Sequence, residues 1–357
     1  MENQAQTLIT TLTAVHNGEA FLRQCLDSLL AQTHRNAQFI CIDDASTDAT
    51  PQILQEYAER DSRFEVITLR ENIGQAAARN IGLKRAKGEF TAMLDADDWF
   101  APDSLAQALA ALQATPEADC ALLQLLLTDG NGPALPRPIP RATVPTTLFP
   151  ELQDPAQWPE TFTGPQALFL SLDWRLHGLY LVRTALHQRY PFDTSTRLFS
   201  DDNTTRLHFL HSRKVVQSQG RYYYRQHANS ATNSADARQW LLLGANLSMK
   251  QTLLREAELQ PELMPWEQVI NYFEAHRWLN LVGLYFRYTK AKQRLSPADR
   301  KAAEEQMAAA LQTIEPRRIC WPIKRKLGYF PVKNFAAFRA QARFYFWLRR
   351  LLGKEPK

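Results

Sequence analysis

Short apolar segments alternate with segments of helical periodicity over the first hundred residues, and this alternation restricts the fold more than any other feature. Residues 7–15 and 38–42 are rich in β-branched and apolar side chains, as buried strands are. Between them, over residues 20–32, apolar side chains recur at steps of three and four. A strand, a helix and a second strand in this order predict a βαβ unit.

The alternation continues to about residue 94. A helix is expected over 50–60, a strand over 64–69, a helix over 75–87 and a strand over 90–94. Strands that alternate with helices predict an α/β fold with a mostly parallel, doubly wound sheet. In such a sheet the ligand crevice lies beyond the carboxyl ends of the strands, where this sequence places its acidic clusters.

The remaining sequence changes character twice. Residues 129–165 are rich in Pro, Gly and Thr, which indicates a surface excursion. From about residue 236 the pattern is helical almost to the end. We therefore expect an α/β domain over 1–235, with halves 1–110 and 111–235, and a helical C-terminal region over 236–357.

The composition is that of an ordinary globular protein, with 45% hydrophobic and 22% charged residues. Its four cysteines form no CxxC pair, so neither a zinc site nor a disulfide framework is expected, and a reducing cytoplasm fits best. The first residues do not resemble a signal peptide, and no apolar run approaches about 20 residues. We expect a chain that is neither exported nor membrane-spanning.

The C-terminal tail, residues 317–357, is strongly basic, with twelve Lys or Arg and one acidic residue. Within it, Phe335, Phe338, Ala342 and Tyr345 recur at helical steps. This pattern suits a helix that lies on an anionic membrane surface. The alternative is a helix that packs its apolar stripe on the α/β domain. The tail shows no nucleic-acid-binding motif, so no nucleic-acid partner is expected.

An acidic cluster, Asp95-Ala96-Asp97-Asp98, follows the strand expected over 90–94. Carboxylates are the ligands that Mg²⁺ and Mn²⁺ prefer, so the cluster is a candidate metal site. For such a cluster alone, the alternative is helix capping, with Asp98 or Asp103 as the cap.

Three motifs that occur in order favour the metal site over helix capping. They are IDDASTD at 42–48, NIGQAAARNIG at 72–82 and DADD at 95–98. Together they resemble the family-2 glycosyltransferases, densely over 7–110 and sparsely to about 232. The resemblance implies a GT-A nucleotide-diphospho-sugar transferase fold and an inverting transfer from a nucleotide sugar, with Mg²⁺ or Mn²⁺ as cofactor.

The resemblance also assigns roles to individual residues. Asp44 is expected to contact the nucleotide base, Asp95 the nucleotide sugar and Asp97 the metal, with Asp98 as a further candidate. Arg79 is expected to face the donor phosphates or sugar, because a guanidinium binds phosphate through two hydrogen bonds. A salt bridge on the helix surface is the alternative for Arg79.

The turn after the first strand departs from the family pattern. A Pro-x-Tyr-Asn-like turn is typical there, whereas this chain has His16 and Asn17 in the stretch AVHNG. We expect both residues at the donor site, with His16 stacked on the base in place of tyrosine. An exposed turn histidine is the alternative, and the identity of the base stays open.

The resemblance places the catalytic base at Asp202, within the stretch Phe199-Ser200-Asp201-Asp202-Asn203. Asp201 stands where the family has glutamate. A single displacement at the anomeric carbon would then invert its configuration. Helix capping by either aspartate is the alternative.

The segment at 222–232, YYYRQHANSAT, resembles a Tyr-x-Tyr-Arg-x-His-x-x-Ser stretch of bacterial polysaccharide transferases. By this likeness Arg225 would bind the diphosphate and His227 the metal, although a lone histidine is as often a structural hydrogen-bond donor. Trp174 lies in a segment expected to face the acceptor, where it would stack on a sugar or pack in the core.

The resemblance and the basic tail predict a cytoplasmic enzyme, peripheral on the inner face of the membrane. It would transfer a sugar, from a UDP-sugar by preference, to a saccharide acceptor that is lipid-linked, in cell-envelope polysaccharide synthesis. Transfer to a protein or a polyol-phosphate polymer is an alternative. A non-catalytic sugar- or nucleic-acid-binding module on a dead transferase fold is another, and the intact Asp44, Asp95, Asp97 and Asp202 argue against it.

Overall fold

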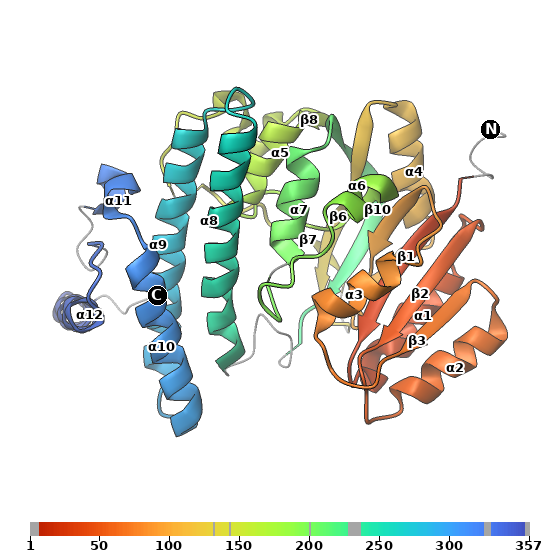
Figure 1. Ribbon diagram of the computed structural model, residues 1–357, viewed down its shortest axis with the longest axis horizontal. Helices are drawn as coiled ribbons and strands as arrows, with labels where there is room; N and C mark the ends of the chain where they lie inside the picture. Colours follow the sequence, from red (N-terminus) through yellow and green to blue (C-terminus); the bar gives the residue numbers. More distant parts are fainter. Residues whose placement is uncertain are drawn as a thin grey trace. The chain divides into compact units, whose positions relative to one another are not determined.

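The computed structural model describes residues 7–130, 133–142, 144–199, 201–227, 237–324 and 330–353. It divides into two compact units (Figure 1). Unit 1 comprises Met1–Pro140 and Asp154–Ser230, and unit 2 comprises Arg141–Gln153 and Ala231–Lys357. The boundary expected at 235 lies outside the described residues. No helix that the structure describes has the length and apolarity needed to cross a membrane.

The first half of unit 1 has the expected alternation of strands and helices. Its elements are β1 (Ile9–Val15), α1 (Glu19–Leu30), β2 (Ala37–Asp43), α2 (Thr50–Arg60), β3 (Phe64–Thr68), α3 (Gln75–Leu83) and β4 (Phe90–Met93). Helix α3 ends four residues before the predicted position. The Gln38 side chain accepts a hydrogen bond from the Lys87 N–H at 3.0 Å and donates one to the Arg85 carbonyl at 3.2 Å, which holds this segment in a turn.

The second half of unit 1 completes one mixed sheet in the order β3-β2-β1-β4-β9-β6-β10-β5. Its elements are β5 (Trp99–Phe100), α4 (Ser104–Ala114), β6 (Ala118–Thr128), β7 (Leu135–Pro136), 3₁₀ helix η2 (Pro155–Gln157), β8 (Thr161–Thr163), α5 (Gly164–Ser171), β9 (Tyr180–Arg183), α6 (Thr184–Arg189), α7 (Asp201–Leu210) and β10 (Lys214–Arg225). The pairings β1–β2, β1–β4, β2–β3 and β6–β10 are parallel, and each described antiparallel pairing extends over only two or three residues.

The segment 129–165 is less irregular than expected. It contains β7, which pairs with β6, and β8, which pairs with β10. Phe162 in β8 is buried, so the pairing also adds a side chain to the core. Neither strand was predicted from the sequence, because each is only two or three residues long and the surrounding segment is rich in Pro and Gly.

The core of unit 1 lies on both faces of the sheet, and β2 shows how. Phe39 and Cys41 belong to the cluster that includes apolar residues of α1 and α2, whereas Ile40 and Ile42 pack with residues of α3. Strand residues alternate between the two faces because the side-chain period of a strand is two. The sheet is thus apolar on both faces. Because β1, β2 and β4 are parallel, the polar loops that follow them lie together at the carboxyl ends of these strands.

Strand β10 is one continuous strand of 12 residues. The register with β6 shifts between Gln217 and Arg221. A Cβ atom at Gly220 would lie 2.5 Å from the Ser104 carbonyl oxygen, so only glycine fits at this approach. The irregular stretch interrupts the apolar pattern but not the strand, whose end reaches the loop after β4.

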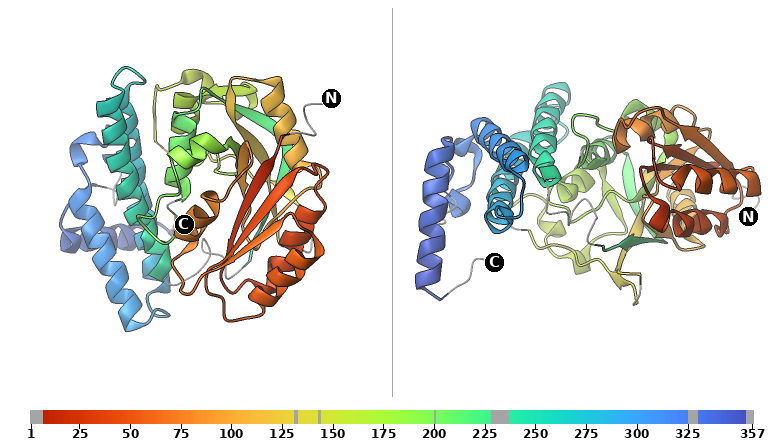
Figure 2. Two further views of the ribbon diagram at one scale, coloured as in Figure 1. Left: turned by 45° about the vertical axis from the view of Figure 1, so that its right-hand side comes forward. Right: turned by 90° about the horizontal axis from the view of Figure 1, so that it is seen from below.

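Unit 2 is helical, as predicted. Its elements are η1 (Pro150–Leu152), η3 (Ala237–Trp240), α8 (Leu241–Leu259), α9 (Trp266–Ala291), α10 (Pro297–Thr313), η4 (Pro316–Arg318), α11 (Trp321–Lys324) and α12 (Phe335–Leu351). Helices α8, α9 and α10 run side by side, and α12 crosses the direction of α9 and α10 (Figures 1 and 2). A fully buried carboxylate, Glu274, lies among them and binds Lys250 at 3.1 Å and Arg277 at 2.7 Å.

Candidate active site

The acidic loop, residues 95–98, follows the carboxyl end of β4, an inner strand of the sheet. The Asp95 carboxylate accepts hydrogen bonds from the Arg79 guanidinium and from the Gln75 side-chain amide, the latter at 3.0 Å. Burial raises the pKa of Asp95, and the charge of Arg79 opposes that rise. Arg79 is only 1% exposed, so it fixes the orientation of Asp95 and does not reach solvent.

Asp97 and His227 meet at this end of the sheet, although they come from different ends of unit 1. The His227 Nε2 atom lies 2.9 Å from the Asp97 Oδ2 atom, and the Asp97 side chain is 38% exposed. The histidine ring also contacts Phe21 of α1, with 5.0 Å between ring centroids. The two residues predicted as metal ligands are therefore adjacent and accessible.

The donor set of this pair fits a divalent cation. Within the described ranges, no three His, Cys, Asp or Glu side chains are grouped as a metal site. The protein therefore offers one carboxylate oxygen and one imidazole nitrogen here. Mg²⁺ and Mn²⁺ take six ligands and commonly complete their shells with phosphate oxygens and water. This end of the sheet suits a cation that is bound together with a diphosphate.

Asp98 has a structural role in this loop. Its buried carboxylate accepts hydrogen bonds from the Tyr222 hydroxyl at 2.8 Å and from the Arg225 N–H at 2.7 Å. Burial raises the pKa of Asp98 well above its usual range. Helix capping is excluded, because Asp103 occupies the N-cap of α4 and neither aspartate makes a side-chain cap hydrogen bond there.

Arg225 supports the same loop from the end of β10. Its guanidinium lies between the rings of Phe21 and Trp99, 4.6 and 4.7 Å from their centroids. The Nε atom donates to the Asp97 carbonyl at 2.9 Å, and the other end of the group binds the Gln24 side chain. These contacts anchor the backbone of the acidic loop beside the Asp97–His227 pair.

The first motif is tied to the second through Asp44. Both oxygens of this buried carboxylate accept backbone hydrogen bonds, from Ile73 at 2.8 Å and from Gly74 at 2.9 Å. Gly74 has a φ of +90°, which favours glycine. In the neighbouring Asp43, one carboxylate oxygen accepts the Ser46 N–H, and the other is buried without a partner. Sequence reasoning singled out Asp44 and passed over Asp43.

His16 and Asn17 lie in an exposed turn after β1, at the same end of the sheet. The His16 Nδ1 atom lies 2.8 Å from the Asp44 carbonyl oxygen, which fixes the ring orientation. Asn17 has a φ of +54° and accepts the Thr47 N–H at 2.8 Å. The turn therefore presents an oriented, solvent-accessible imidazole beside the first motif.

Asp201 and Asp202 begin α7. The charge of Asp201 helps to raise the pKa of Asp95, which shows that this end of α7 lies near the acidic loop. Among the residues that the structure describes, none donates a hydrogen bond to the carboxylate of Asp202. Burial and the charge of Asp201 raise the pKa of Asp202 to about 7, against the opposing charges of Arg206 and Arg137. The arrangement provides an unpartnered carboxylate that titrates near neutral pH.

Trp174 lies on the surface of unit 1. It is 37% exposed and has a φ of +63°, so the interpretation as a core residue is wrong. Its carbonyl oxygen accepts a hydrogen bond from Arg137 at 2.8 Å. Since Arg137 also acts on the pKa of Asp202, the turn that carries Trp174 is close to the candidate base.

Several supporting residues were not predicted from the sequence. Gln75 is part of the second motif and could have been noticed there. Tyr222 lies in a stretch that was noted, but the burial of its hydroxyl against Asp98 depends on pairing between distant strands. Arg137 lies in the Pro-rich excursion, where no local pattern marks it.

The fold is of the GT-A type, and comparisons with known proteins agree. Residues 10–170 match the family model Glycosyl transferase family 2, so this part of the chain is similar to that family. The uncharacterized glycosyltransferase EpsJ of Bacillus subtilis is 30% identical over 230 residues, 63% of each chain. The O-antigen biosynthesis protein RfbC of Myxococcus xanthus is 40% identical over 127 residues, 35% of this chain and 10% of RfbC.

A solved structure shows the same fold. TarS 1–349 of S. aureus, in complex with UDP-GlcNAc, aligns with a TM-score of 0.65 at 19% identity, over 99% of this chain and 93% of the TarS chain. The chain thus spans 63% of EpsJ and 10% of RfbC, whereas the structural likeness to TarS extends over nearly its whole length.

Proposed function

We propose that this chain is an inverting, metal-dependent glycosyltransferase that moves a sugar from a UDP-sugar to a hydroxyl group of a saccharide acceptor. The observation that carries this proposal is the site itself. An accessible Asp97–His227 pair lies in the same unit as the Asp202 carboxylate, which accepts no hydrogen bond from the residues that the structure describes, and Asp201 beside it acts on the pKa of Asp95 in the acidic loop. The UDP-GlcNAc complex of TarS supports the choice of donor class.

The residues have distinct tasks in the proposed reaction. Asp97 and His227 would hold a divalent cation, which neutralises charge on the departing diphosphate. Asp202 takes the proton from the acceptor hydroxyl, whose oxygen forms the new bond to the anomeric carbon while the bond to the diphosphate breaks. Attack from the face opposite to the diphosphate inverts the anomeric configuration. A base that titrates near neutral pH suits this proton transfer.

The acceptor is proposed to be a lipid-linked saccharide, in cell-envelope polysaccharide synthesis at the inner face of the membrane. The name of the relative RfbC, an O-antigen biosynthesis protein, supports a polysaccharide acceptor. The basic tail supports a location at a membrane surface. Chromatography of labelled product distinguishes this acceptor from a protein or a polyol-phosphate polymer.

The donor assignment is tested by calorimetry with a panel of nucleotide sugars, with Mn²⁺ and with EDTA. UDP-sugars should bind the wild-type protein and Glu59→Ala, a control on the exposed face of α2, only when Mn²⁺ is present. Asp97→Ala should lose the metal-dependent part of binding while its melting temperature stays unchanged. Equal donor affinity in EDTA, or a product with retained anomeric configuration, would refute the proposal.

A further inference from the structure

Helix α12 has two apolar faces, and the first is occupied. Phe338 is buried against Trp278 and Tyr285 of α9, with ring centroids at 5.6 and 5.0 Å. Ala342 is buried on the same face, and the ring centroid of Tyr345 lies 5.8 Å from that of Phe286 in α9. The stripe noticed in the sequence is therefore used for packing on α9 inside unit 2.

The second face points away from this contact. Phe344, Trp347 and Leu351 are 51%, 56% and 64% exposed. They follow one another at steps of three and four residues, which places them on one side of a helix. The ring centroids of Phe344 and Trp347 lie 5.7 Å apart, so these two side chains are neighbours on the exposed side of the helix. An apolar patch of this kind marks an interaction surface. We call Phe344, Trp347 and Leu351 the outer face.

Two arginines border the outer face. Arg343 and Arg350 are exposed, and within the described part of the chain neither forms an ion pair. The sequence has no Asp or Glu between Glu315 and Glu355. A helix with exposed aromatic residues beside unpaired arginines matches a surface that is apolar beneath and anionic above.

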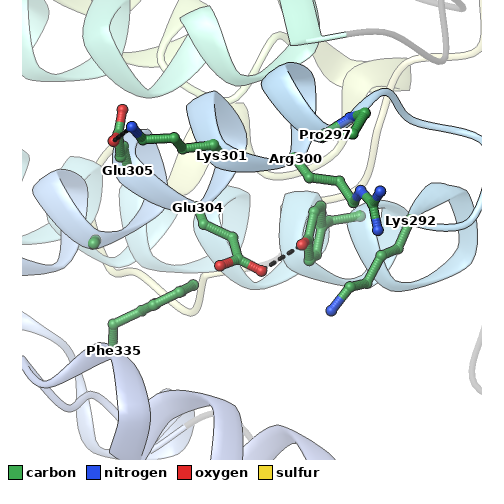
Figure 3. A pocket seen from close by; sticks show the side chains of 9 residues that line it. Lys292, Pro297, Arg300, Lys301, Glu304, Glu305 and Phe335 are labelled. Atoms are coloured by element: carbon green, nitrogen blue, oxygen red, sulfur yellow. Dashed lines mark hydrogen bonds and ion pairs between the residues drawn. The ribbon is translucent and has the colours of Figure 1, made fainter.

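A second cation-rich surface of unit 2 lacks this combination. A pocket of 510 Å³ between α9, α10 and α12 is lined by Lys292, Arg300 and Lys301 (Figure 3). Glu304 and Glu305 lie in the same wall, and Lys301 is 3.9 Å from Glu305. The charges there are nearly balanced. This surface therefore supplies a matched control.

We infer that the outer face of α12, with Arg343 and Arg350, docks this protein on an anionic lipid bilayer. The helix would lie flat at the interface, with Phe344, Trp347 and Leu351 among the acyl chains and the arginines at the headgroup phosphates. The opposite face stays packed on α9, so docking needs no rearrangement of unit 2. The inference uses residues of unit 2 alone and is independent of the sugar-transfer chemistry.

A second copy of the chain is a poorer occupant. In a two-fold contact the same patch meets itself, so Arg343 and Arg350 would face their own copies. Like charges placed together across an interface are unfavourable. A bilayer that contains anionic lipid instead provides the opposite charge across a broad plane.

Flotation of the full chain with vesicles tests the inference. Wild-type protein should float with vesicles of phosphatidylcholine and phosphatidylglycerol, but not with phosphatidylcholine alone, and binding should weaken as salt rises. Both Phe344→Ser/Trp347→Ser and Arg343→Glu/Arg350→Glu should bind at least about 10-fold less. Lys292→Glu/Lys301→Glu, which changes the charge equally in the pocket, should bind as wild type does.

Unchanged melting curves and unchanged donor binding would show that the outer-face variants are folded and that the reaction site is separate. The inference fails if these variants float as wild type does, or if the pocket variant loses as much binding. It also fails if light scattering shows a wild-type dimer that Phe344→Ser/Trp347→Ser converts to a monomer, because the outer face would then bind a second copy.

Discussion

The carboxylates of the site differ in how fully they are hydrogen-bonded, and this difference separates chemical from structural roles. Asp44 and Asp98 are buried, and backbone N–H groups or a tyrosine hydroxyl bind both oxygens of each. Asp202 receives no hydrogen bond from the described residues. The oxygens of Asp44 and Asp98 are already occupied by these hydrogen bonds, so of the three carboxylates Asp202 is the one placed to accept a proton from a substrate hydroxyl.

Replacement of Asp202 by Asn should impair turnover and leave donor binding intact. The amide keeps the shape of the side chain but cannot take a proton. We expect kcat to fall by about 100-fold or more, with donor affinity close to the wild-type value. Steady-state kinetics and calorimetry measure the two effects. If Asp202→Asn turns over normally and Asp201→Asn does not, the base is Asp201.

The pH profile provides a second test of the same residue. Because the pKa of Asp202 is raised to about 7, the carboxyl group is protonated and inactive below that pH, and kcat should rise as pH increases through it. Asp201→Asn removes the neighbouring negative charge, so the pKa of Asp202 should fall and the rising limb should move to lower pH. A limb that stays in place in this variant would contradict the assignment.

At the scale of elements, β10 holds the site together. Tyr222 and Arg225 belong to this strand, His227 follows its end, and all three bind the acidic loop. The Tyr222 hydroxyl both donates to Asp98 and accepts the Asp95 N–H, the latter at 3.1 Å. One strand thus positions the accessible Asp97–His227 pair through buried polar contacts.

Tyr222→Phe should loosen this connection. The buried Asp98 carboxylate would lose a donor, which costs about 1 to 3 kcal/mol of unfolding free energy. We expect urea denaturation to show this loss, together with a higher KM for the donor and a nearly unchanged kcat. Tyr223→Phe is the matched control, because the Tyr223 ring stacks on Trp99 at 5.3 Å and does not bind the acidic loop. Equal effects of the two variants would contradict the role of the hydroxyl.

The elements differ in how far local sequence determines them. Helix α2 has the predicted bounds, because Pro51 in its first turn and a regular apolar stripe mark it locally. Strand β5, by contrast, is two residues long and forms only where Trp99 and Phe100 meet β10 more than 120 residues later. The same applies to the site. Motifs revealed the aspartates, but the inward positions of Arg79 and Arg225 depend on packing that no local pattern encodes.

At the scale of the whole molecule, buried histidines link stability to pH. His208 lies between the Tyr180 hydroxyl at 2.7 Å and the Tyr190 carbonyl at 2.8 Å, and His187 lies 2.8 Å from the Thr91 hydroxyl. Burial lowers the pKa of His208 to about 4 and that of His187 well below its usual value. Both rings are therefore neutral in the folded protein.

Stability should accordingly fall under acid conditions. The unfolded chain binds protons at these histidines below about pH 6.5, whereas the folded chain does not, so unfolding is favoured as pH falls from about 6.5 toward 4. For His208 the loss is on the order of 3 kcal/mol over this range. Urea denaturation at several pH values measures it. The slope of the unfolding free energy against pH should be smaller in His208→Gln and unchanged in His16→Gln. An unchanged slope in both variants would contradict the link between buried histidines and acid instability.

The contact between Asp97 and His227 joins residues that are 130 positions apart, and that between Tyr222 and Asp98 joins residues 124 apart. During synthesis, the acidic loop therefore leaves the ribosome long before its partners. Until β10 is complete, a nascent chain holds the Asp98 carboxylate without its two hydrogen-bond donors and contains only one member of the Asp97–His227 pair. Contacts between such distant residues form late in folding, because a long loop must close first. Interrupted translation should thus yield fragments that bind no nucleotide sugar and that proteases degrade.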